Sequence, residues 1–306
     1  MKRYRNLLIL MLLLVLVNLV NAVSIHGAKT FVIGFSSPAL NEFYIRFEDF
    51  AKIGARNLGV RLITLNAEDN GEKQIRDVED LIARGVDGII VAPVTDAIAK
   101  TILQKCETAN IPVIVADRNP GIQPQDQFKK YLAFIGPDNE EAGYRIAKYL
   151  INNMSPGKDG VKSLVALEGK LGSSNSELRT KGLMRALAEH PEVRLLAKQS
   201  AGFDRDQGMK VMEDFLVAFD NIDAVWSAND AMALGAIAAI RNANRMNEMI
   251  VGGMDTDRDA CESVARNQLK YTSGGHWLTG GFALVTLYDY LNGIPVQKEE
   301  RFAEVK

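Results

Sequence analysis

The sequence predicts an α/β fold of two similar, doubly wound lobes, each built on a parallel sheet. Short β-branched runs alternate along the chain with stretches whose apolar residues recur at helical spacing. That alternation stops near Pro137-Asp138-Asn139 and then starts again. The length of 306 residues leaves room for two domains of about 150 residues each. Strand, helix and strand in repetition imply right-handed crossovers and therefore a mostly parallel sheet.

The first lobe is predicted from five short apolar runs that read as strands buried on both faces. The helices between them have one apolar face each, such as Phe43, Phe47 and Phe50 in the first and Val78 and Leu81 in the second. The five runs are residues 31–35, 61–65, 88–91, 113–116 and 132–135.

The second lobe is predicted from four further strands, at residues 164–167, 193–196, 224–227 and 250–253. Helices fit the segments 176–189, 206–219, 231–243 and 257–266 between them. One more apolar helix, at 278–291, has no comparable strand after it. We therefore expect it to pack on a sheet that is already formed.

Composition excludes several classes of protein. Lys and Arg number 36 and Asp and Glu 38, so the formal net charge is −2 and the basic excess of a nucleic-acid-binding protein is missing. Two Cys and three His are too few for a disulfide framework, a four-Cys zinc site or a His-rich metal centre, and no cofactor is expected. Cys106 and Cys261 both lie in apolar-patterned helices, which predicts buried free thiols.

Residues 1–22 have the pattern of a secretory signal peptide. A basic start precedes an apolar run over 7–20, and small residues follow it, which places cleavage after Ala22 or, alternatively, after Ala28. An uncleaved anchor is less favoured because the run is shorter than the ~20 residues that span a bilayer. Cleavage after Ala22 removes Lys2, Arg3 and Arg5. With no Cys nearby to accept a lipid, we expect the mature protein in the periplasm of a cell with two membranes.

Polar and aromatic residues gather just after the predicted strands, where parallel sheets bind ligands. Asp, Asn and Arg together offer the donors and acceptors that sugar hydroxyls need, and aromatic rings can cover the apolar face of a sugar. Taken singly, Asn and Asp at these places cap helices more often than they bind ligands, and Asp230 is assigned to capping. Arg118 and Arg179 have no capping role at a helix N-terminus, which favours the ligand interpretation.

Specific motifs resemble those of the periplasmic ribose- and pentose-binding proteins of ABC sugar importers, which are type I solute-binding proteins. The resemblance covers about residues 30–300 and rests on the motifs as a set. They are Asn41-Glu-Phe-Tyr44, Ile111-Pro-Val-Ile-Val-Ala-Asp117-Arg118, Arg179-Thr-Lys-Gly182, Phe203-Asp-Arg, Asn229-Asp-Ala-Met-Ala-Leu-Gly235 and Val251-Gly-Gly-Met-Asp255.

The resemblance implies a set of ligand contacts from both lobes. From the first lobe these are Asn41, Phe43, Tyr44, Asp117 and Arg118, and from the second lobe and hinge Arg179, Phe203, Asn229, Asp255 and His276. It also implies a three-segment hinge near 135–138, 273–276 and 298–301. The first lobe would comprise 29–135 and 277–298, and the second 138–274 and 299–306.

Three positions depart from the family pattern. Tyr44 stands where a Phe is usual, Ala92 where an Asn is usual, and the Gln of the second hinge is replaced by Gly275 or, with a shift of one residue, His276. Each lost amide removes hydrogen bonds worth ~1 kcal/mol apiece. The resemblance implies ribose or another pentose, and the lost amides favour a different pentose, a polyol or a furanose-like signal over ribose itself.

The resemblance implies that the protein binds a monosaccharide by hinge closure and delivers it to the permease and ATPase of an ABC importer. It also implies that the protein acts as a monomer. A sensor that presents a sugar-like signal to a membrane chemoreceptor is the alternative. An enzyme is disfavoured because GxSxG, GxxxxGK[ST], GxGxxG and HExxH motifs are missing. A transcriptional repressor is also disfavoured, because it would need an N-terminal helix-turn-helix domain and the 22-residue leader is too short and too apolar to be one. Asp255-Thr-Asp257-Arg-Asp259 lacks the Gly and Glu of a calcium loop and reads as an acidic helix start.

Overall fold

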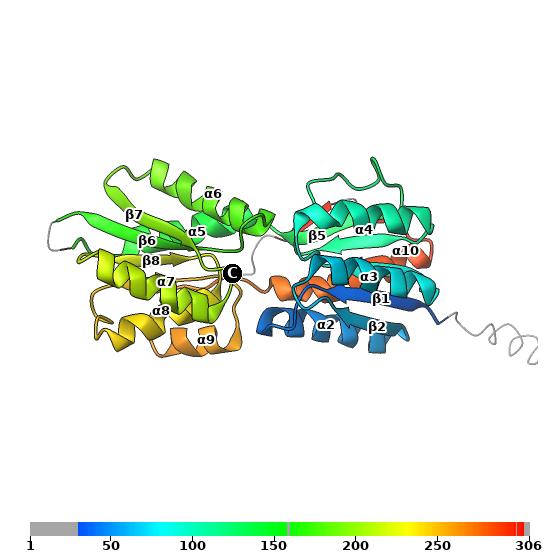
Figure 1. Cartoon of the computed structure of the whole chain (residues 1–306), viewed down its shortest axis with the longest axis horizontal. Helices are drawn as coiled ribbons and strands as arrows, with labels where there is room; N and C mark the ends of the chain where they lie inside the picture. Colours follow the sequence, from blue (N-terminus) through cyan, green and yellow to red (C-terminus); the bar gives the residue numbers. More distant parts are fainter. Residues whose placement is uncertain (1–29, 158–159, 298, 303–306) are drawn as a thin grey trace, which may run out of the picture.

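A computed structural model of the chain describes residues 30–157, 160–297 and 299–302. Two lobes lie end to end along the long axis of the molecule (Figure 1). One contains a six-stranded sheet of order β10-β5-β4-β3-β1-β2 and the other a four-stranded sheet of order β7-β6-β8-β9. All strand pairs within both sheets are parallel, which confirms the predicted fold class. The predicted signal peptide lies outside the described residues.

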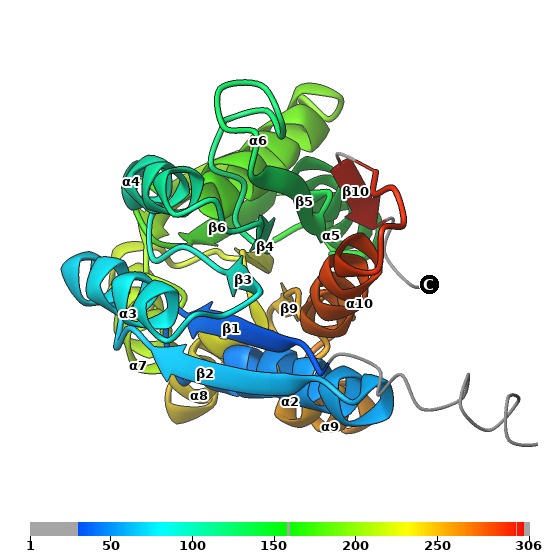
Figure 2. The ribbon, with the colours of Figure 1, turned by 90° about the vertical axis from the view of Figure 1, so that its right-hand side faces the viewer.

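The first sheet has helices on both faces (Figure 2). Helices α2 and α10 cover one face, where Phe47 and Leu284 join a buried cluster, and α3 and α4 cover the other, around Leu81 and Ile102. The elements are β1 (Val32–Ser37), α2 (Glu42–Leu58), β2 (Arg61–Asn66), α3 (Gly71–Ala83), β3 (Gly88–Val91), α4 (Asp96–Thr108), β4 (Val113–Ala116), β5 (Tyr131–Pro137), α10 (Thr279–Leu291) and β10 (Glu299–Phe302).

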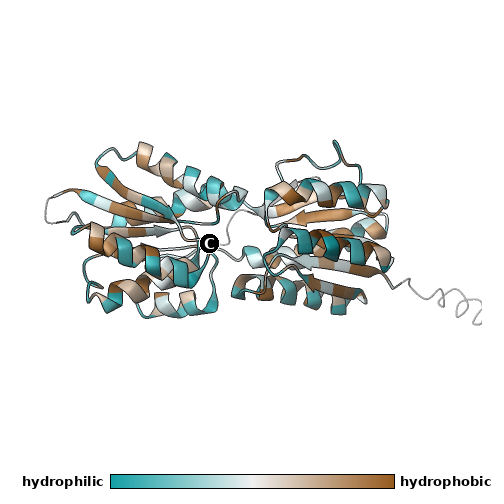
Figure 3. Ribbon diagram, viewed as in Figure 1, coloured by the Kyte–Doolittle hydropathy of each residue, from teal (hydrophilic) through white to brown (hydrophobic). Residues whose placement is uncertain are grey.

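The second lobe has one continuous core around the fully buried Trp226, whose indole N–H donates to the carbonyl of Gly143 at 3.0 Å. Hydrophobic residues are prominent on strands of both lobes (Figure 3), as burial on two faces requires of central strands such as Val113–Ala116 and Ala224–Ser227. The elements are α5 (Asn139–Asn153), β6 (Lys162–Glu168), α6 (Ser174–Ala188), β7 (Val193–Ser200), α7 (Arg205–Ala218), β8 (Ala224–Ser227), α8 (Asp230–Asn242), β9 (Ile250–Gly252) and α9 (Arg258–Ala265).

Helices α5 and α6 approach so closely that their contact has no room for a side chain. A Cβ on Gly182 would lie 2.0 Å from the carbonyl oxygen of Glu140, and one on Gly143 would lie 2.0 Å from that of Arg179. Glycine at both positions lets the two backbones touch. This contact fixes the first turns of α6, which carry Arg179, directly beside the start of α5.

The chain passes between the lobes at two described segments. It leaves the first sheet at the end of β5 and enters α5 through Asp138, which caps that helix by accepting from the N–H of Glu141. It returns between α9 and a short 3₁₀ turn, η1 (His276–Leu278), where Gly274 forms a bridge with Asp255. The exact limits of the lobes and of the three-segment hinge stay predictions.

Two expectations differ from the structure. Glu299–Phe302 pairs with β5 in the first sheet, whereas residues from 299 onward were assigned to the second lobe; this charged segment has no apolar run that would reveal its partner. Cys106 is a buried free thiol as expected, but Cys261 is exposed. On α9 the buried positions are Ala260 and Ser263, so Cys261 is turned away from the core. Within the described segments, no helix is long and apolar enough to cross a bilayer.

Candidate functional site

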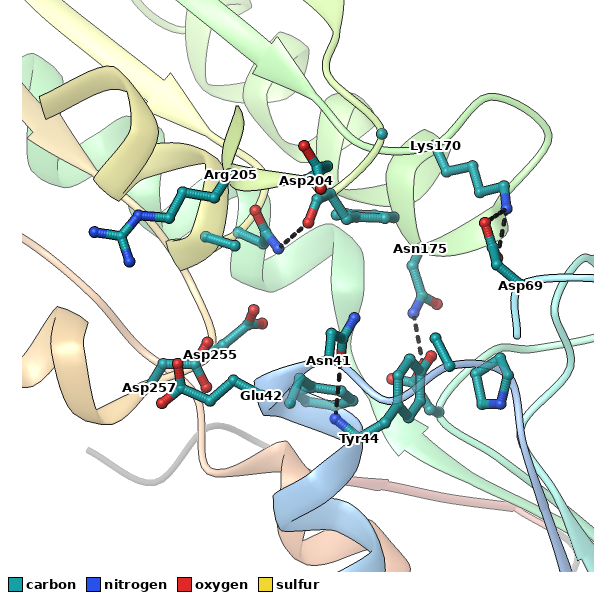
Figure 4. Close-up of a pocket in the computed structure, with 18 of the residues that line it drawn as sticks. Asn41, Glu42, Tyr44, Asp69, Lys170, Asn175, Asp204, Arg205, Asp255 and Asp257 are labelled. Carbon is teal, nitrogen blue, oxygen red and sulfur yellow. Dashed lines mark hydrogen bonds and ion pairs between the residues drawn. The ribbon is translucent and has the colours of Figure 1, made fainter. Parts of the chain in front are cut away.

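A cavity of about 470 Å³ lies between the lobes, at the carboxyl ends of strands from both sheets. Figure 4 shows side chains from both lobes around this cavity, such as Tyr44 of the first lobe and Asn175 of the second. All ten residues named from the sequence line this cavity: Asn41, Phe43, Tyr44, Asp117, Arg118, Arg179, Phe203, Asn229, Asp255 and His276.

Tyr44 and Asp117 form the polar wall of the first lobe. The Tyr44 hydroxyl donates to Oδ2 of Asp117 at 2.7 Å, and both side chains are buried. Burial and the Asp117 charge raise the pKa of Tyr44, so the phenol stays a donor. The hydroxyl that distinguishes Tyr44 from Phe therefore occupies one oxygen of Asp117. The other oxygen is the acceptor that remains for a ligand.

Arg118 is anchored by backbone carbonyls. Its Nη1 donates to the carbonyl oxygens of Pro93 and Val94, and the side chain is buried. Its Nε is buried without a hydrogen-bond partner in the described part of the chain. Buried donors are nearly always paired, so the guanidinium keeps a hydrogen-bonding capacity that a bound molecule can satisfy.

Arg179 organises the second lobe side of the cavity. Its Nε donates to Oδ1 of Asn139 at 2.8 Å and its Nη1 to the carbonyl of Ala228 at 2.6 Å. The same Nη1 lies 3.7 Å from Oδ1 of Asp255, and the guanidinium stands 5.6 Å from the ring centroid of Phe203. These contacts hold a planar fork of donors rigidly beside a carboxylate and an aromatic face.

Asp255 is held between Arg179 and His276, whose Nε2 lies 3.2 Å from Asp255 Oδ1. Burial raises the pKa of Asp255 to about 7, although the Arg179 charge opposes the shift. His276 also packs on Phe43, with ring centroids 4.7 Å apart. The structure thus brings His276 to the cavity wall, while Gly275 adopts a φ of 85° and does not line it.

Asn41 and Asn229 both cap helices and line the cavity. Asn41 accepts from the N–H of Tyr44 at 3.0 Å, and Asn229 accepts from the N–H of Met232 at 3.0 Å. The amide nitrogen of Asn229 also donates to the carbonyl of Phe203 at 3.3 Å. The capping and ligand interpretations are therefore compatible at these positions, because capping uses only the side-chain oxygen.

Four cavity residues other than glycine have a positive φ, which non-glycine residues rarely adopt. Their φ angles are 58° for Asp69, 64° for Asp117, 64° for Phe203 and 133° for Asp255. Such strain persists only where surrounding contacts enforce it, and it concentrates at functional sites. Strain at these four residues therefore supports the cavity as the candidate functional site.

The expectation that Asp230 caps a helix is wrong. Asn229 is the cap of α8, and Asp230 is fully buried. Its Oδ2 accepts from the N–H of Asp257 at 3.1 Å and from the hydroxyl of Thr272 at 2.8 Å. Asp230 therefore anchors the loop that carries Asp255, a role that local sequence does not reveal because its partners lie 27 and 42 residues away.

Sequence reasoning missed several residues at the cavity. Asn175 donates to Oδ2 of Asp117 at 3.3 Å and accepts from Asn139 at 3.1 Å, which links the lobes through buried amides. Its place after β6 was the available signal. Other unpredicted lining residues include Glu42, Asp69, Lys170, Asp204, Arg205 and Asp257.

The lobes contact each other across the cavity mouth. Lys170 of the second lobe pairs with Asp69 of the first at 2.6 Å. Ser174 donates its backbone N–H to Asp96 at 2.9 Å, and Arg46 donates to the carbonyl of Thr256 at 3.2 Å. This arrangement is a closed one, in which a small molecule would be enclosed on two sides.

Comparison with known proteins finds one matching family and several similar proteins and structures. A family described as "Periplasmic binding protein domain" matches residues 33–294. The ribose import binding protein RbsB of Bacillus subtilis is 30% identical over 272 residues, which are 88% of this chain and 85% of that protein. An ABC transporter solute-binding protein from Bacillus halodurans with bound myo-inositol has a TM-score of 0.80 at 30% identity, covering 91% and 94% of the two chains. The fructose-binding periplasmic domain of a hybrid two-component system has a TM-score of 0.80 at 28% identity, covering 90% and 86%.

Proposed function

The chain belongs to the periplasmic binding protein family, and we propose that it captures a monosaccharide or a related polyol between its lobes. The observation that carries the proposal is the convergence of Asp117 from one lobe and Arg179 and Asp255 from the other on one closed cavity. Relatives that bind ribose and myo-inositol support the ligand class. The proposal involves binding alone, without a catalytic step.

The mechanism is hinge closure around the ligand. A sugar first contacts the first lobe, where Asp117 and Arg118 offer an acceptor and a donor. Closure then adds Arg179, Phe203 and Asp255 from the second lobe. A ligand shifts the balance between open and closed forms only by its greater affinity for the closed one, and these second-lobe contacts supply that difference.

The closed surface is what a membrane partner distinguishes from the open one. We expect that partner to be the permease and ATPase of an ABC importer, because the Bacillus subtilis relative is named an import binding protein and the Bacillus halodurans one an ABC transporter solute-binding protein. We further propose a periplasmic monomer exported by a cleaved signal peptide at residues 1–22. The similarity to a periplasmic domain of a two-component system supports a second role, in which the closed form signals to a membrane sensor.

Ribose itself is not the favoured ligand among the candidates. Ala92 and Gly275 offer no side-chain amide, and Tyr44 occupies one oxygen of Asp117. A ligand that depends on those groups would leave polar atoms unpaired when enclosed, at ~1–3 kcal/mol each. A ring with a different set of hydroxyl positions fits these changes better.

Thermal unfolding with a ligand panel tests the proposal. The mature protein is unfolded and refolded to remove bound ligand, then melted with pentoses, hexoses, inositol and linear polyols. A ligand at 100 times its Kd should stabilise by ~2.7 kcal/mol, a clear shift in Tm. A shift with one stereochemical group supports the proposal, whereas a flat response to the whole panel contradicts it.

A further inference from the structure

Three carboxylates meet at one corner of the cavity, which we call the acid corner. Glu42 begins α2 in the first lobe, and Asp255 and Asp257 precede α9 in the second. Figure 4 shows the Glu42 side chain running from the start of α2 toward Asp257 and Asp255. Closure of the lobes therefore brings like charges together across the cleft.

Asp257 is the unusual member of the acid corner. The residue is only 4% exposed, and its Oδ1 is buried without a hydrogen-bond partner in the part of the chain that the structure describes. Although Asp257 is the N-cap residue of α9, its side chain makes no capping hydrogen bond. Capping, the ordinary reason for an Asp at a helix start, is therefore not what this carboxyl group does.

Charge in the acid corner is only partly balanced. Arg46 lies 3.5 Å from Glu42 and also donates to a backbone carbonyl, and Arg179 and His276 contact Asp255. Asp257 forms no ion pair with another described residue. Burial, Asp255 and Glu42 raise the pKa of Asp257 to about 8, with Arg46 opposing, and the nearby Asp230 adds a further acidic group.

The geometry of the acid corner favours a counter-charge other than a metal ion. Among the described residues, no group of three or more His, Cys, Asp and Glu side chains is arranged to hold one. An ammonium group makes less demand on geometry, because it is a compact charge with donors that rotate to their acceptors. The Asp257 carboxyl group is buried, unpaired and faces the cavity, so it suits such a group, which on binding would replace the proton that Asp257 holds at pH 7.

We propose that the acid corner is a subsite for a ligand ammonium group, so that the preferred ligand is an amino-substituted sugar or amino cyclitol. This inference rests on the proposed function, since it narrows the ligand class of the same cavity. The ammonium would lie between Glu42 and Asp257 and remove the repulsion that closure creates. The ring hydroxyls would lie toward Asp117 and Arg179.

Matched ligand pairs test the inference by titration calorimetry at pH 7 on the refolded, ligand-free protein. The pairs are glucosamine with glucose, galactosamine with galactose, and an amino-deoxy-inositol with myo-inositol. In at least one pair the amine should bind about tenfold more tightly or better, as expected for a hydrogen-bonded ion pair. Asp257→Asn should reduce that preference to about twofold or less, while Asp259→Asn, an exposed neighbour that pairs with Arg205, should retain it.

A second variant guards against misfolding of Asp257→Asn. Glu42 lies at the exposed rim of the cavity, so Glu42→Gln should fold normally and still weaken the preference for the amine. If the neutral member binds as tightly as the amine in every pair, the inference fails and the proposed function stands. If neither amines nor neutral sugars and polyols bind, both fail.

Discussion

Replacing Tyr44 with Phe removes a single hydroxyl from the buried wall of the cavity. That hydroxyl donates to Asp117 at 2.7 Å, and the two side chains are 6% and 2% exposed. A buried hydrogen bond to a charged group contributes ~1.5–3 kcal/mol. Asp117 would keep only the longer 3.3 Å contact with Asn175, so we expect a loss of about 2 kcal/mol.

The loss is measured by thermal melting of the ligand-free protein at pH 7. For a domain of 150–250 residues, 1 kcal/mol corresponds to about 2–4 °C, so Tm should fall by roughly 4–8 °C. Tyr144→Phe is the matched control, because the Tyr144 hydroxyl donates to Glu189 at 2.8 Å at an exposed place where water can replace it. Equal Tm values for the two variants would refute the reasoning about the buried wall.

Three further predictions concern charge, closure and packing. Because the pKa of Asp257 is raised to about 8, the folded protein holds a proton that the unfolded chain releases near pH 4, so stability should fall from pH 5 to pH 8. Asp255, whose pKa is raised to about 7, contributes in the same direction, so Asp257→Asn should reduce this slope, and an unchanged slope would contradict the assignment. Lys170→Ala removes an ion pair at the cavity mouth and should weaken ligand binding by about fivefold or less, an effect that high salt should abolish in calorimetry. Gly182→Ala puts a Cβ 2.0 Å from the Glu140 carbonyl and should lower Tm severely, whereas Gly281→Ala, whose Cβ would meet its nearest atom at 3.4 Å, should melt close to wild type.

The fold could be predicted from the sequence because its strands are buried on both faces. The segments 88–91, 113–116 and 224–227 are short runs with an Asp directly beside one end, and each is a strand with those limits in the structure. The strand Glu299–Phe302 has a charged sequence without an apolar pattern, so only the family resemblance implied a crossing segment near 298–301, and its pairing with β5 in the first sheet was not predicted. Tertiary pairing, which local propensity does not encode, decided that element.

Residues of the candidate site could be predicted where they lie in a motif directly after a strand, and less well where they lie near a helix start. Asp117 and Arg118 directly follow a strand, and the rule for parallel sheets places them at the cavity. Asn175 and Asp257 were missed as cavity residues because each lies near a helix start, where capping is the commoner role. Asp230 was assigned to capping for the same reason, although its partners belong to distant loops.

Calorimetric titration of the wild type and Asp255→Ala with the best ligand of the panel tests the central claim most directly. Asp255 contacts both Arg179 and His276 in the closed cavity, so its loss removes a second-lobe contact that closure supplies. The account predicts one binding site in the wild type and affinity weaker by about thirtyfold or more in the variant, with an unchanged circular dichroism spectrum. Equal affinity in the two proteins would show that the ligand is held elsewhere and would contradict the proposed site.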